Sequence, residues 1–501
     1  MNEPTAGTID RTEEPASAVP AAPREGLSLA QAIRLTLLNN RTLEKAGLDR
    51  ETQRFALRVA EDEFMPNLDL STSALYNPVR IDDEETTERF GAVTAEVSQR
   101  LPTGGRVALI WENFGTEITP TDSSPLYDSG VLVRFDQPLL RGAGLKTTLA
   151  NLRIARLAEE SNILDFRQTV MDTITRVIFG YRALLQTNLQ LEVTETALQR
   201  AREQLRVNRA LVEAGILPPV EIVQTEADIA SQEFNVLTAR SALETARFNL
   251  IKLLDIDRDT TLEPSDEIKL PEFTLTLEEA RELAYRNRPD YLQSQQGLAI
   301  AGISTDVAKD NRLWDLLLST RYRLDGNDSE LDSAIDEALS RSNEDWSVGL
   351  TLNVPIGDLT RRQGYLRARN QALKAAIDLV EVRENIEIEL RDVFRNIELS
   401  QQRVRVSTVA RELAERKLEI EKGKLQTGRT TNFAIVTFQN DLVRARLNEI
   451  SAKISFLNAL SNLDQTLGAT LDTWGIRMEE LDHTGPDSTP ASTSTSAPSS
   501  P

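Results

Sequence analysis

The chain repeats itself, and this internal repeat limits the possible folds more than any other feature of the sequence. Leu27–Ala32 recurs as Leu275–Ala280 at a spacing of 248 residues, and Gly215 recurs as Gly428 at a spacing of 213. The shorter spacing means that the first copy carries about 35 additional residues between these blocks, around residues 78–128. Each copy has the same predicted order: a helix, strands, a very long helix, a tight turn and a returning helix. We therefore expect one elongated unit built twice.

Two segments carry the heptad pattern of long coiled-coil helices. In residues 146–213 an apolar residue recurs every seven positions from Val170 to Val212, and residues 359–426 carry a similar stripe that only Arg411 interrupts. At 1.5 Å per residue each helix would be about 100 Å long. The shorter predicted helices are two opening helices, 29–62 and 277–310, and two returning helices, 219–254 and 432–467.

Two short helices placed end to end match one long helix in length, which predicts four rods of equal height, two continuous and two broken. The polar segment 255–274 contains two prolines and should form a belt at mid-height. The predicted domain plan is therefore a first repeat (27–254), this equatorial linker, and a second repeat (275–475).

Apolar and polar residues alternate within 66–139 and 314–356, for example from Trp346 to Ile356. Alternating segments of about ten residues are typical of transmembrane barrel strands, and they also fit a half-buried soluble sheet. Four strands cannot close a barrel, whereas three protomers would supply about twelve. An additional hairpin around Pro102–Gly105 is interpreted as an enlarged extracellular or barrel-rim hairpin, and the sequence leaves open whether residues 93–111 join the barrel. The predicted fold is mostly α, a trimeric α-barrel of long helices joined to a membrane β-barrel.

Composition excludes several classes of function. The net charge is −21 with no cluster of Lys or Arg, which argues against nucleic-acid binding. This acidity indicates either a solvated surface or a negative lumen that favours cations. There are no cysteines, and His483 is the only histidine, so disulfides, thiolate or multi-histidine metal sites and Ser-His-Asp catalysis are not expected. We expect no enzyme activity, no catalytic residues, no metal and no cofactor.

The two ends of the chain differ from the rest in composition. No apolar run approaches the ~20 residues of a spanning helix. Residues 1–26 contain no hydrophobic segment of the kind that an exported protein is expected to carry. Residues 1–26 and 476–501 are poor in apolar residues and are predicted to be disordered, so their deletion should leave the stability of a trimer unchanged.

The doubled plan resembles the TolC family of outer-membrane factors. The matching motifs are Gln137-Pro138-Leu139 and Val354-Pro355-Ile356 before the long helices, and the turns at Ala214-Gly215 and Thr427-Gly428. The resemblance covers about 27–475. It implies a homotrimer with its β-barrel in the lipid of the outer membrane and a long α-barrel in the periplasm. It also implies a passive exit duct that docks to a periplasmic adaptor and an inner-membrane pump, in a tripartite efflux pump or a type I secretion system.

The same resemblance indicates site residues. The helix-hairpin tips, where adaptors dock in the family, correspond to Gly215, Ile216, Leu217, Gly428, Arg429 and Thr430. Acidic residues early on the returning helices often constrict the closed tip in the family. Glu221 matches one such position, whereas the second copy has Ala434 and Thr437 at the matching positions. The candidate gate residues are Glu221, Gln224, Thr437 and Asp441.

The main alternative is a periplasmic coiled-coil adaptor or scaffold protein. An adaptor should have one helical hairpin flanked by a split β-sandwich, whereas this sequence predicts two hairpins and strands at only one end. A hydrolase would need a convergent histidine or metal constellation, which the sequence lacks. The sequence does not identify the exported substrate or the class of pump.

Overall fold

The computed structural model describes residues 26–81, 84–119, 125–340, 343–427 and 429–478. The predicted disordered tails therefore lie almost entirely outside the described residues. The described chain divides into two compact units: a helical unit (residues up to 47, 167–288 and from 386 on) and a sheet unit (48–166 and 289–385). Within the described ranges, no helix combines the length and the apolar character needed to cross a membrane.

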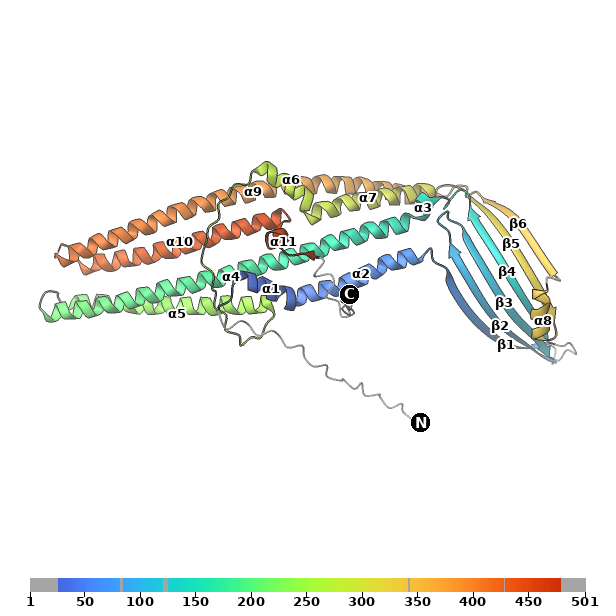
Figure 1. Ribbon diagram of the computed structural model, residues 1–501, viewed down its shortest axis with the longest axis horizontal. Coiled ribbons are helices and arrows are strands. Elements are labelled where there is room, and N and C mark those ends of the chain that lie inside the picture. The colour runs from blue at the N-terminus through green and yellow to red at the C-terminus, as the bar shows by residue number, and fades with distance from the viewer. Residues whose placement is uncertain (1–25, 82–83, 120–124, 341–342, 428, 479–501) are drawn as a thin grey trace, which may run out of the picture. The chain divides into compact units, whose positions relative to one another are not determined.

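Figure 1 labels the elements of both units. The helices are α1 (Leu29–Asn39), α2 (Arg41–Asp62), α3 (Leu145–Thr148), α4 (Ala150–Glu213), α5 (Val220–Leu254), α6 (Leu277–Asn287), α7 (Pro289–Asp310), α8 (Leu331–Leu339), α9 (Leu359–Gln426), α10 (Asn432–Thr466) and α11 (Thr470–Thr473). The strands are β1 (Asn67–Ile81), β2 (Glu84–Arg100), β3 (Arg106–Thr119), β4 (Leu126–Pro138), β5 (Asp315–Asp328) and β6 (Asn343–Asn353).

Two short helices, α1 and α6, begin with the same capping box. The Ser28 hydroxyl accepts the Gln31 N–H, and the Gln31 side chain accepts the Ser28 N–H. Thr276 and Glu279 make the same reciprocal pair before α6. Each box satisfies backbone N–H groups that the start of a helix leaves without partners. The two starts are equivalent positions at the repeat spacing of 248 residues.

Each predicted opening helix is in fact two helices, so the single helices expected over 29–62 and 277–310 are wrong. Asn40 separates α1 from α2, and Arg288 separates α6 from α7; both residues have extended backbone. Pro289 follows Arg288 and disfavours helical geometry at the residue before it. The Asn40 side chain accepts the Thr42 N–H at 2.9 Å and so caps α2.

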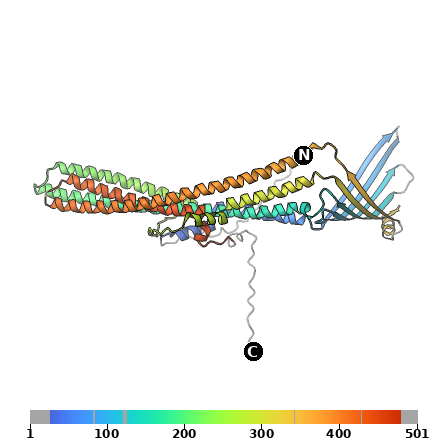
Figure 2. The ribbon, with the colours of Figure 1, turned by 90° about the horizontal axis from the view of Figure 1, so that it is seen from above.

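The long helices form antiparallel hairpins with their return helices, α4 with α5 and α9 with α10 (Figure 2). The bounds of α9 are those predicted, whereas α4 begins four residues late because the short α3 precedes it. The heptad stripe is the packing face of both long helices: Val177 and Leu184 on α4 are fully buried, and Leu390 and Ile397 on α9 are 1% exposed.

The non-helical segment after α5 packs against α4 at Tyr181. α5 ends at Leu254, and the capping residue Asp255 has a positive φ of 52°. The buried Tyr181 hydroxyl lies 2.7 Å from Oδ2 of Asp266 and 2.9 Å from the carbonyl oxygen of Leu27, so both can accept its proton. Burial, with a further contribution from Asp266, raises the pKa of the Tyr181 phenol. This predicted linker is therefore fixed to the core of the helical unit.

The sheet unit contains one six-stranded antiparallel sheet in the order β1-β2-β3-β4-β5-β6. The sequence predicted four strands per protomer and left the place of residues 93–111 open. These residues form parts of β2 and β3, which lie between β1 and β4. The count of four is therefore wrong for this chain.

The β2–β3 turn is also placed differently from the prediction of an extracellular or rim hairpin. It lies at the helix end of the sheet, where β4 leads into α3. The Gly144 N–H donates to the carbonyl oxygen of Thr103 at 2.9 Å. Gly104 has a φ of +95°, and a Cβ there would lie 2.2 Å from the carbonyl oxygen of Gly142. Only glycine fits this close contact between the two turns.

The sheet has one apolar and one polar face. Strand pairing places one residue of each strand in a row on the apolar face: Leu68, Val97, Leu109, Val133, Tyr322 and Trp346. On the opposite face, Glu96 pairs with Arg106 (3.4 Å) and Arg134 (3.8 Å), and Glu112 pairs with Arg323 (2.8 Å). The alternation predicted from the sequence thus extends across all six strands.

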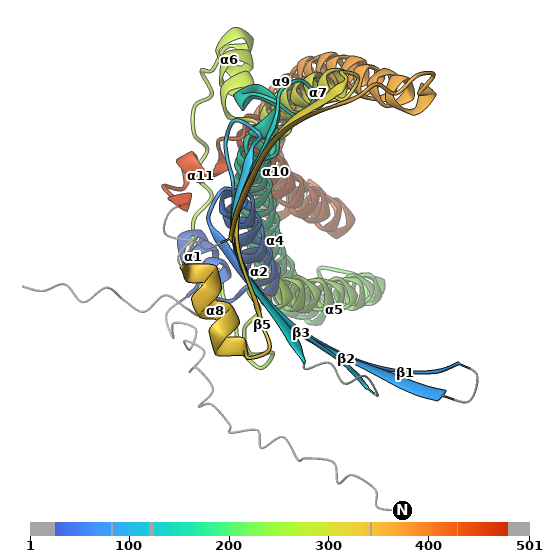
Figure 3. The same ribbon diagram turned by 90° about the vertical axis from the view of Figure 1, so that its right-hand side faces the viewer.

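A short helix, α8, interrupts the region that the sequence assigned to strands 314–356. Ala334 and Ala338 are buried against the sheet, and a Cβ at Gly326 would lie 2.0 Å from the carbonyl oxygen of Ala334. Gly326 lies on the same face of β5 as Leu324 and Tyr322, which is the apolar face. α8 therefore covers the apolar face at the end of the sheet away from α3. Figure 3 shows α8 on the convex side of the curved sheet.

Candidate hairpin-tip site and family

The turn between α4 and α5 is a Schellman motif centred on Gly215. The Gly215 N–H donates to the carbonyl oxygen of Val212 at 2.9 Å, and the Ile216 N–H donates to that of Leu211 at 2.8 Å. Gly215 has a φ of +71°, and no atom would lie within 4 Å of a Cβ built there. The backbone conformation, and not the available space, therefore requires glycine at this position.

The surface of the first tip is apolar. Ile216 is 67% exposed, and Val220 and Val223, in the first turn of α5, are almost equally exposed. Leu217 is half-buried, and its N–H shares the Leu211 carbonyl oxygen at 3.2 Å. Exposed apolar side chains at the end of a helical hairpin are typical of a surface that another chain covers.

The second tip shows the same backbone pattern on either side of Gly428, which lies outside the described residues. The Arg429 N–H donates to the carbonyl oxygen of Lys424 at 2.9 Å, across the same five-residue interval as Ile216 to Leu211. The Thr430 hydroxyl donates to the Glu421 carboxylate. This bond, followed by the contact with Lys424, lowers the pKa of Glu421.

The four candidate gate residues do not form one cluster within this chain. Glu221, Gln224 and Asp441 are half-buried and Thr437 is exposed, with its hydroxyl donating to the carbonyl oxygen of Phe433 at 2.8 Å. Among the described contacts, no hydrogen bond or ion pair joins any two of the four. Oε2 of Glu221 is buried and lacks a hydrogen-bond partner among the described atoms. A buried carboxylate oxygen needs a donor, which water or another copy of the chain can supply.

The sequence prediction missed a buried layer of uncharged polar side chains next to the first tip. Thr225 (α5) is fully buried, and its hydroxyl oxygen accepts hydrogen bonds from Asn208 (α4, 2.8 Å) and Asn432 (α10, 3.2 Å). Gln204 donates to the side-chain oxygens of Asn208 and Asn432 at 2.9 and 3.1 Å. The layer joins the two hairpins. Asn208 lies three residues after Leu205 of the stripe, so its position on the packing face was a usable signal.

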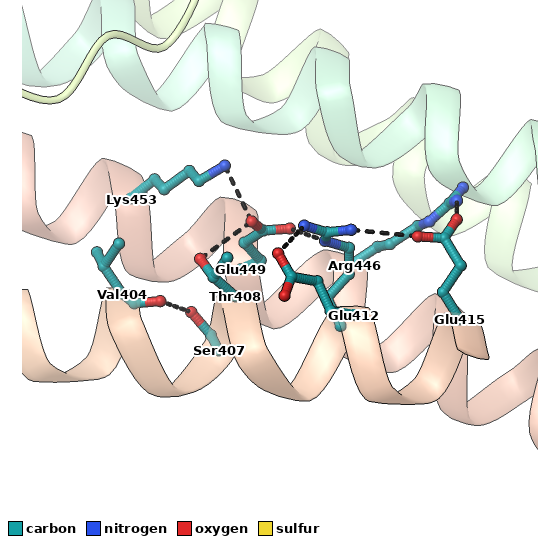
Figure 4. A network of polar contacts seen from close by, with 9 residues as sticks. Val404, Ser407, Thr408, Glu412, Glu415, Arg446, Glu449 and Lys453 are labelled. Atoms are coloured by element: carbon teal, nitrogen blue, oxygen red, sulfur yellow. Dashed lines mark hydrogen bonds and ion pairs between the residues drawn. The ribbon is translucent and has the colours of Figure 1, made fainter. Parts of the chain in front are cut away.

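Arg411, which interrupts the heptad stripe of α9, is the centre of a charged cluster. Its guanidinium pairs with Glu449 of α10 at 3.0 Å and with Glu415 at 3.1 Å. Glu449 is 8% exposed and also pairs with Lys453 at 3.0 Å, while Arg446 pairs with Glu415 at 2.8 Å. Figure 4 shows how Lys453, Thr408 and the glutamates converge from the two helices. Arg411, the charged residue that interrupts the stripe, is therefore paired with Glu449 of α10.

Neither polar group resembles a metal or catalytic site. The amide layer contains no ionisable side chain, and each carboxylate of the charged cluster is paired with Lys or Arg. Across the described ranges, no group of three or more His, Cys, Asp or Glu residues could hold a metal ion.

Comparison with known proteins identifies the architecture. A sequence profile described as "Outer membrane efflux protein" matches residues 125–255, from β4 to the end of α5. This part of the chain is similar to the outer membrane efflux proteins. The expected resemblance to the TolC family is confirmed.

Two curated relatives match this chain over most of their length. The outer membrane efflux protein BepC of Brucella suis biovar 1 (strain 1330) is 21% identical over 406 residues, which cover 80% of this chain and 83% of BepC. The proteases secretion protein PrtF of Dickeya chrysanthemi is 20% identical over 453 residues, 89% of this chain and 88% of PrtF.

Solved structures have the same fold. The Campylobacter jejuni CmeC outer membrane channel superposes with a TM-score of 0.66 at 15% identity, covering 91% of this chain and 89% of CmeC. The outer-membrane channel OprN gives a TM-score of 0.66 at 18% identity, covering 88% and 90%. At these identities the structures establish the fold of this chain and nothing finer.

Proposed function

We propose that the protein is the outer-membrane channel of an efflux or secretion machine, a passive exit duct and not an enzyme. Three copies close a β-barrel in the outer membrane, and their helices form a periplasmic conduit. A periplasmic adaptor docks at the hairpin tips, and an inner-membrane pump delivers the substrate.

The observation that carries this proposal is the two-faced sheet with two open edges. Its apolar face suits lipid, and its paired charges suit a water-filled lumen. β6 is exposed along its whole length, and no strand among the described residues pairs with the outer side of β1. Unpaired edges are not viable in lipid, so the sheet requires further copies of itself. β1 and β6 run in opposite directions, which allows β6 of one copy to pair antiparallel with β1 of the next.

The adaptor or scaffold alternative is not favoured. The profile and BepC are described as outer membrane efflux proteins, and CmeC and OprN are outer-membrane channels. The described chain has two helical hairpins and one sheet, where an adaptor was expected to have one hairpin.

The tips and the gate residues are the finer part of the proposal. Ile216, Leu217, Arg429 and Thr430 would form the docking surface together with Gly215 and Gly428. Glu221, Gln224, Thr437 and Asp441 would narrow the conduit beside it. Glu221 is half-buried and one of its carboxylate oxygens has no hydrogen-bond partner among the described residues, which supports its role at a site completed by assembly.

A substitution at Gly215 tests the docking role. Gly215→Val forces a β-branched residue into a positive-φ conformation, at a local cost of about 1–3 kcal/mol. Gly215→Asn is the matched control, because asparagine tolerates this conformation and the position has room for a side chain. We expect normal trimer abundance in both variants, and loss of adaptor cross-linking and export only in Gly215→Val. Normal cross-linking and export in that variant would place the docking site elsewhere.

A further inference from the structure

We infer that three six-stranded sheets close an eighteen-stranded barrel, whose lumen admits bulky hydrated solutes about 20 Å across. This inference rests on the proposed trimer and specifies the size class of its cargo. The β2–β3 hairpin, absent from the second copy of the repeat, supplies the additional width. Three observations support the assignment of this hairpin to the barrel wall.

The first observation is its alternation. Val93, Ala95 and Val97 of β2 lie on the apolar face, and Thr94 and Glu96 lie on the polar face, in register with β1 and β3. β2 has 17 residues and β3 has 14, while a transmembrane strand needs about 9–11. The apolar part of this face covers Val93–Val97 of β2 and Val107–Trp111 of β3, and beyond it Arg89 and Glu117 form an ion pair at 3.2 Å. A flap outside the membrane would have no need for an apolar band in register with those of its neighbours.

The second observation is the position of the turn. Gly104 contacts the Gly142 carbonyl oxygen too closely for any Cβ, and Thr103 accepts the Gly144 N–H. The hairpin thus extends along the full height of the sheet, from the end away from α3 to the turn that leads into α3. A hairpin at the extracellular rim could not make these contacts.

The third observation is charge pairing across the polar face. Glu96 of β2 pairs with Arg134 of β4, and Glu112 of β3 pairs with Arg323 of β5. The hairpin and the strands common to both copies therefore share one polar surface. If the sheet closes with this face inward, the hairpin lines the lumen.

Strand number sets the width of the barrel. With strands 4.7–4.9 Å apart and tilted by 35–45°, eighteen strands give about 35 Å between opposite backbones, against about 24 Å for twelve. Side chains on both walls reduce these widths to lumens of about 24 and 13 Å. The larger lumen passes a small folded domain or a hydrated polymer that the smaller one excludes.

A first experiment tests whether the hairpin crosses the membrane in the full chain. The sequence has no cysteine, so one introduced cysteine is a unique label site. In outer membranes, a hydrophilic maleimide should label Thr94→Cys and leave its neighbour Val93→Cys unlabelled because lipid covers it. Equal labelling of both residues would overturn the inference, since it would place the hairpin in water on both faces.

A second experiment measures the width. Ser319→Cys lies on the polar face of β5 near the helix end, and Leu318→Cys on the apolar face is its control. Both are exposed to polyethylene glycol maleimides of graded size from outside the cell. The same cysteines are placed in a variant that joins Leu75 to Leu126 through Asn-Gly. This deletion removes β2 and β3 and brings Leu68 opposite Val133, with the apolar face conserved.

We expect polymers of about 20 Å to label Ser319→Cys in the full chain and to be excluded from the deleted variant. A full-chain trimer that excludes polymers above about 13 Å would overturn the eighteen-strand barrel and leave the proposed channel intact. A native mass of two copies would overturn the trimer itself, since two six-stranded sheets give twelve strands. If the deleted variant does not assemble, the cut-off of the full chain alone decides the question.

Discussion

The two helical hairpins use the same heptad pattern and differ in one layer. The stripe of α4 is apolar throughout, from Val170 to Val212. Its first three residues, Val170, Val177 and Leu184, are fully buried. The stripe of α9 places Arg411 between Val404 and Leu418, and α10 supplies Glu449 to pair with it. An apolar layer stabilises without fixing one alignment of the helices, whereas a charged layer is satisfied in a single register. The second hairpin thus gains a specified register at a cost in stability.

The environment of Glu449 explains why the charged layer persists. Burial raises the pKa of its carboxyl, but the hydrogen bond and charge of Lys453 and the charge of Arg411 outweigh burial and hold the pKa below its usual range. Glu449 therefore stays ionised beside Arg411. A buried carboxylate without these partners would be strongly destabilising.

The largest effect should come from the apolar stripe. Leu184 is fully buried in the main core of the helical unit, so Leu184→Ala should lower the free energy of unfolding by about 2–5 kcal/mol. Chemical denaturation of the detergent-solubilised protein measures this loss. Gln199→Ala on the exposed side of the same helix is the control, with an expected change within about 0.5 kcal/mol. Equal effects would show that the stripe is not the packing face.

The charged layer should respond differently. Glu449→Ala leaves Arg411 without its buried partner and should cost about 1–3 kcal/mol. Replacing both residues by leucine restores the stripe and should cost less than the single change, or stabilise the hairpin. A double-mutant cycle by chemical denaturation separates the pair energy. An additive double variant would show that the two residues do not interact in solution.

The smallest expected effect is the dependence of the melting temperature on pH. Because Glu449 has a lowered folded-state pKa, its stabilisation is complete above the ordinary glutamate pKa of about 4.3 and is lost as pH falls through the folded-state value. The melting temperature of the wild type should therefore fall more steeply below about pH 4.3 than that of Glu449→Gln. Parallel curves for the two proteins would contradict this account of the cluster.

Patterns local to the chain predicted most of the helices. Heptads gave the bounds of α9, and the glycine at Gly215 marked a tight turn that the structure contains. The break at Arg288 had a signal in the sequence, because Pro289 disfavours helical geometry at the residue before it. The break at Asn40 has no such signal and depends on the extended backbone of one residue within an otherwise helical segment. The strand count failed for another reason. Alternation identifies a strand, but only the pairing of β2 and β3 with β1 and β4 shows that the hairpin lies inside the sheet.

The site was less predictable than the fold. Glycine spacing located the first tip, yet the amide layer of Asn208, Thr225 and Asn432 depends on three helices that meet only in the folded chain. The sequence indicated the position of the charged layer, because Arg411 interrupts the heptad stripe of α9. The sequence did not indicate the partner of Arg411, because Glu449 lies 38 residues away on the returning helix.

The native mass of the protein extracted from outer membranes tests the central claim most directly. The open edges of β1 and β6 and the exposed apolar face predict that detergent-solubilised protein has the mass of three copies and is insoluble without detergent. A stable monomer that remains soluble in the absence of detergent would contradict the channel, because a single sheet would then satisfy both of its edges in water.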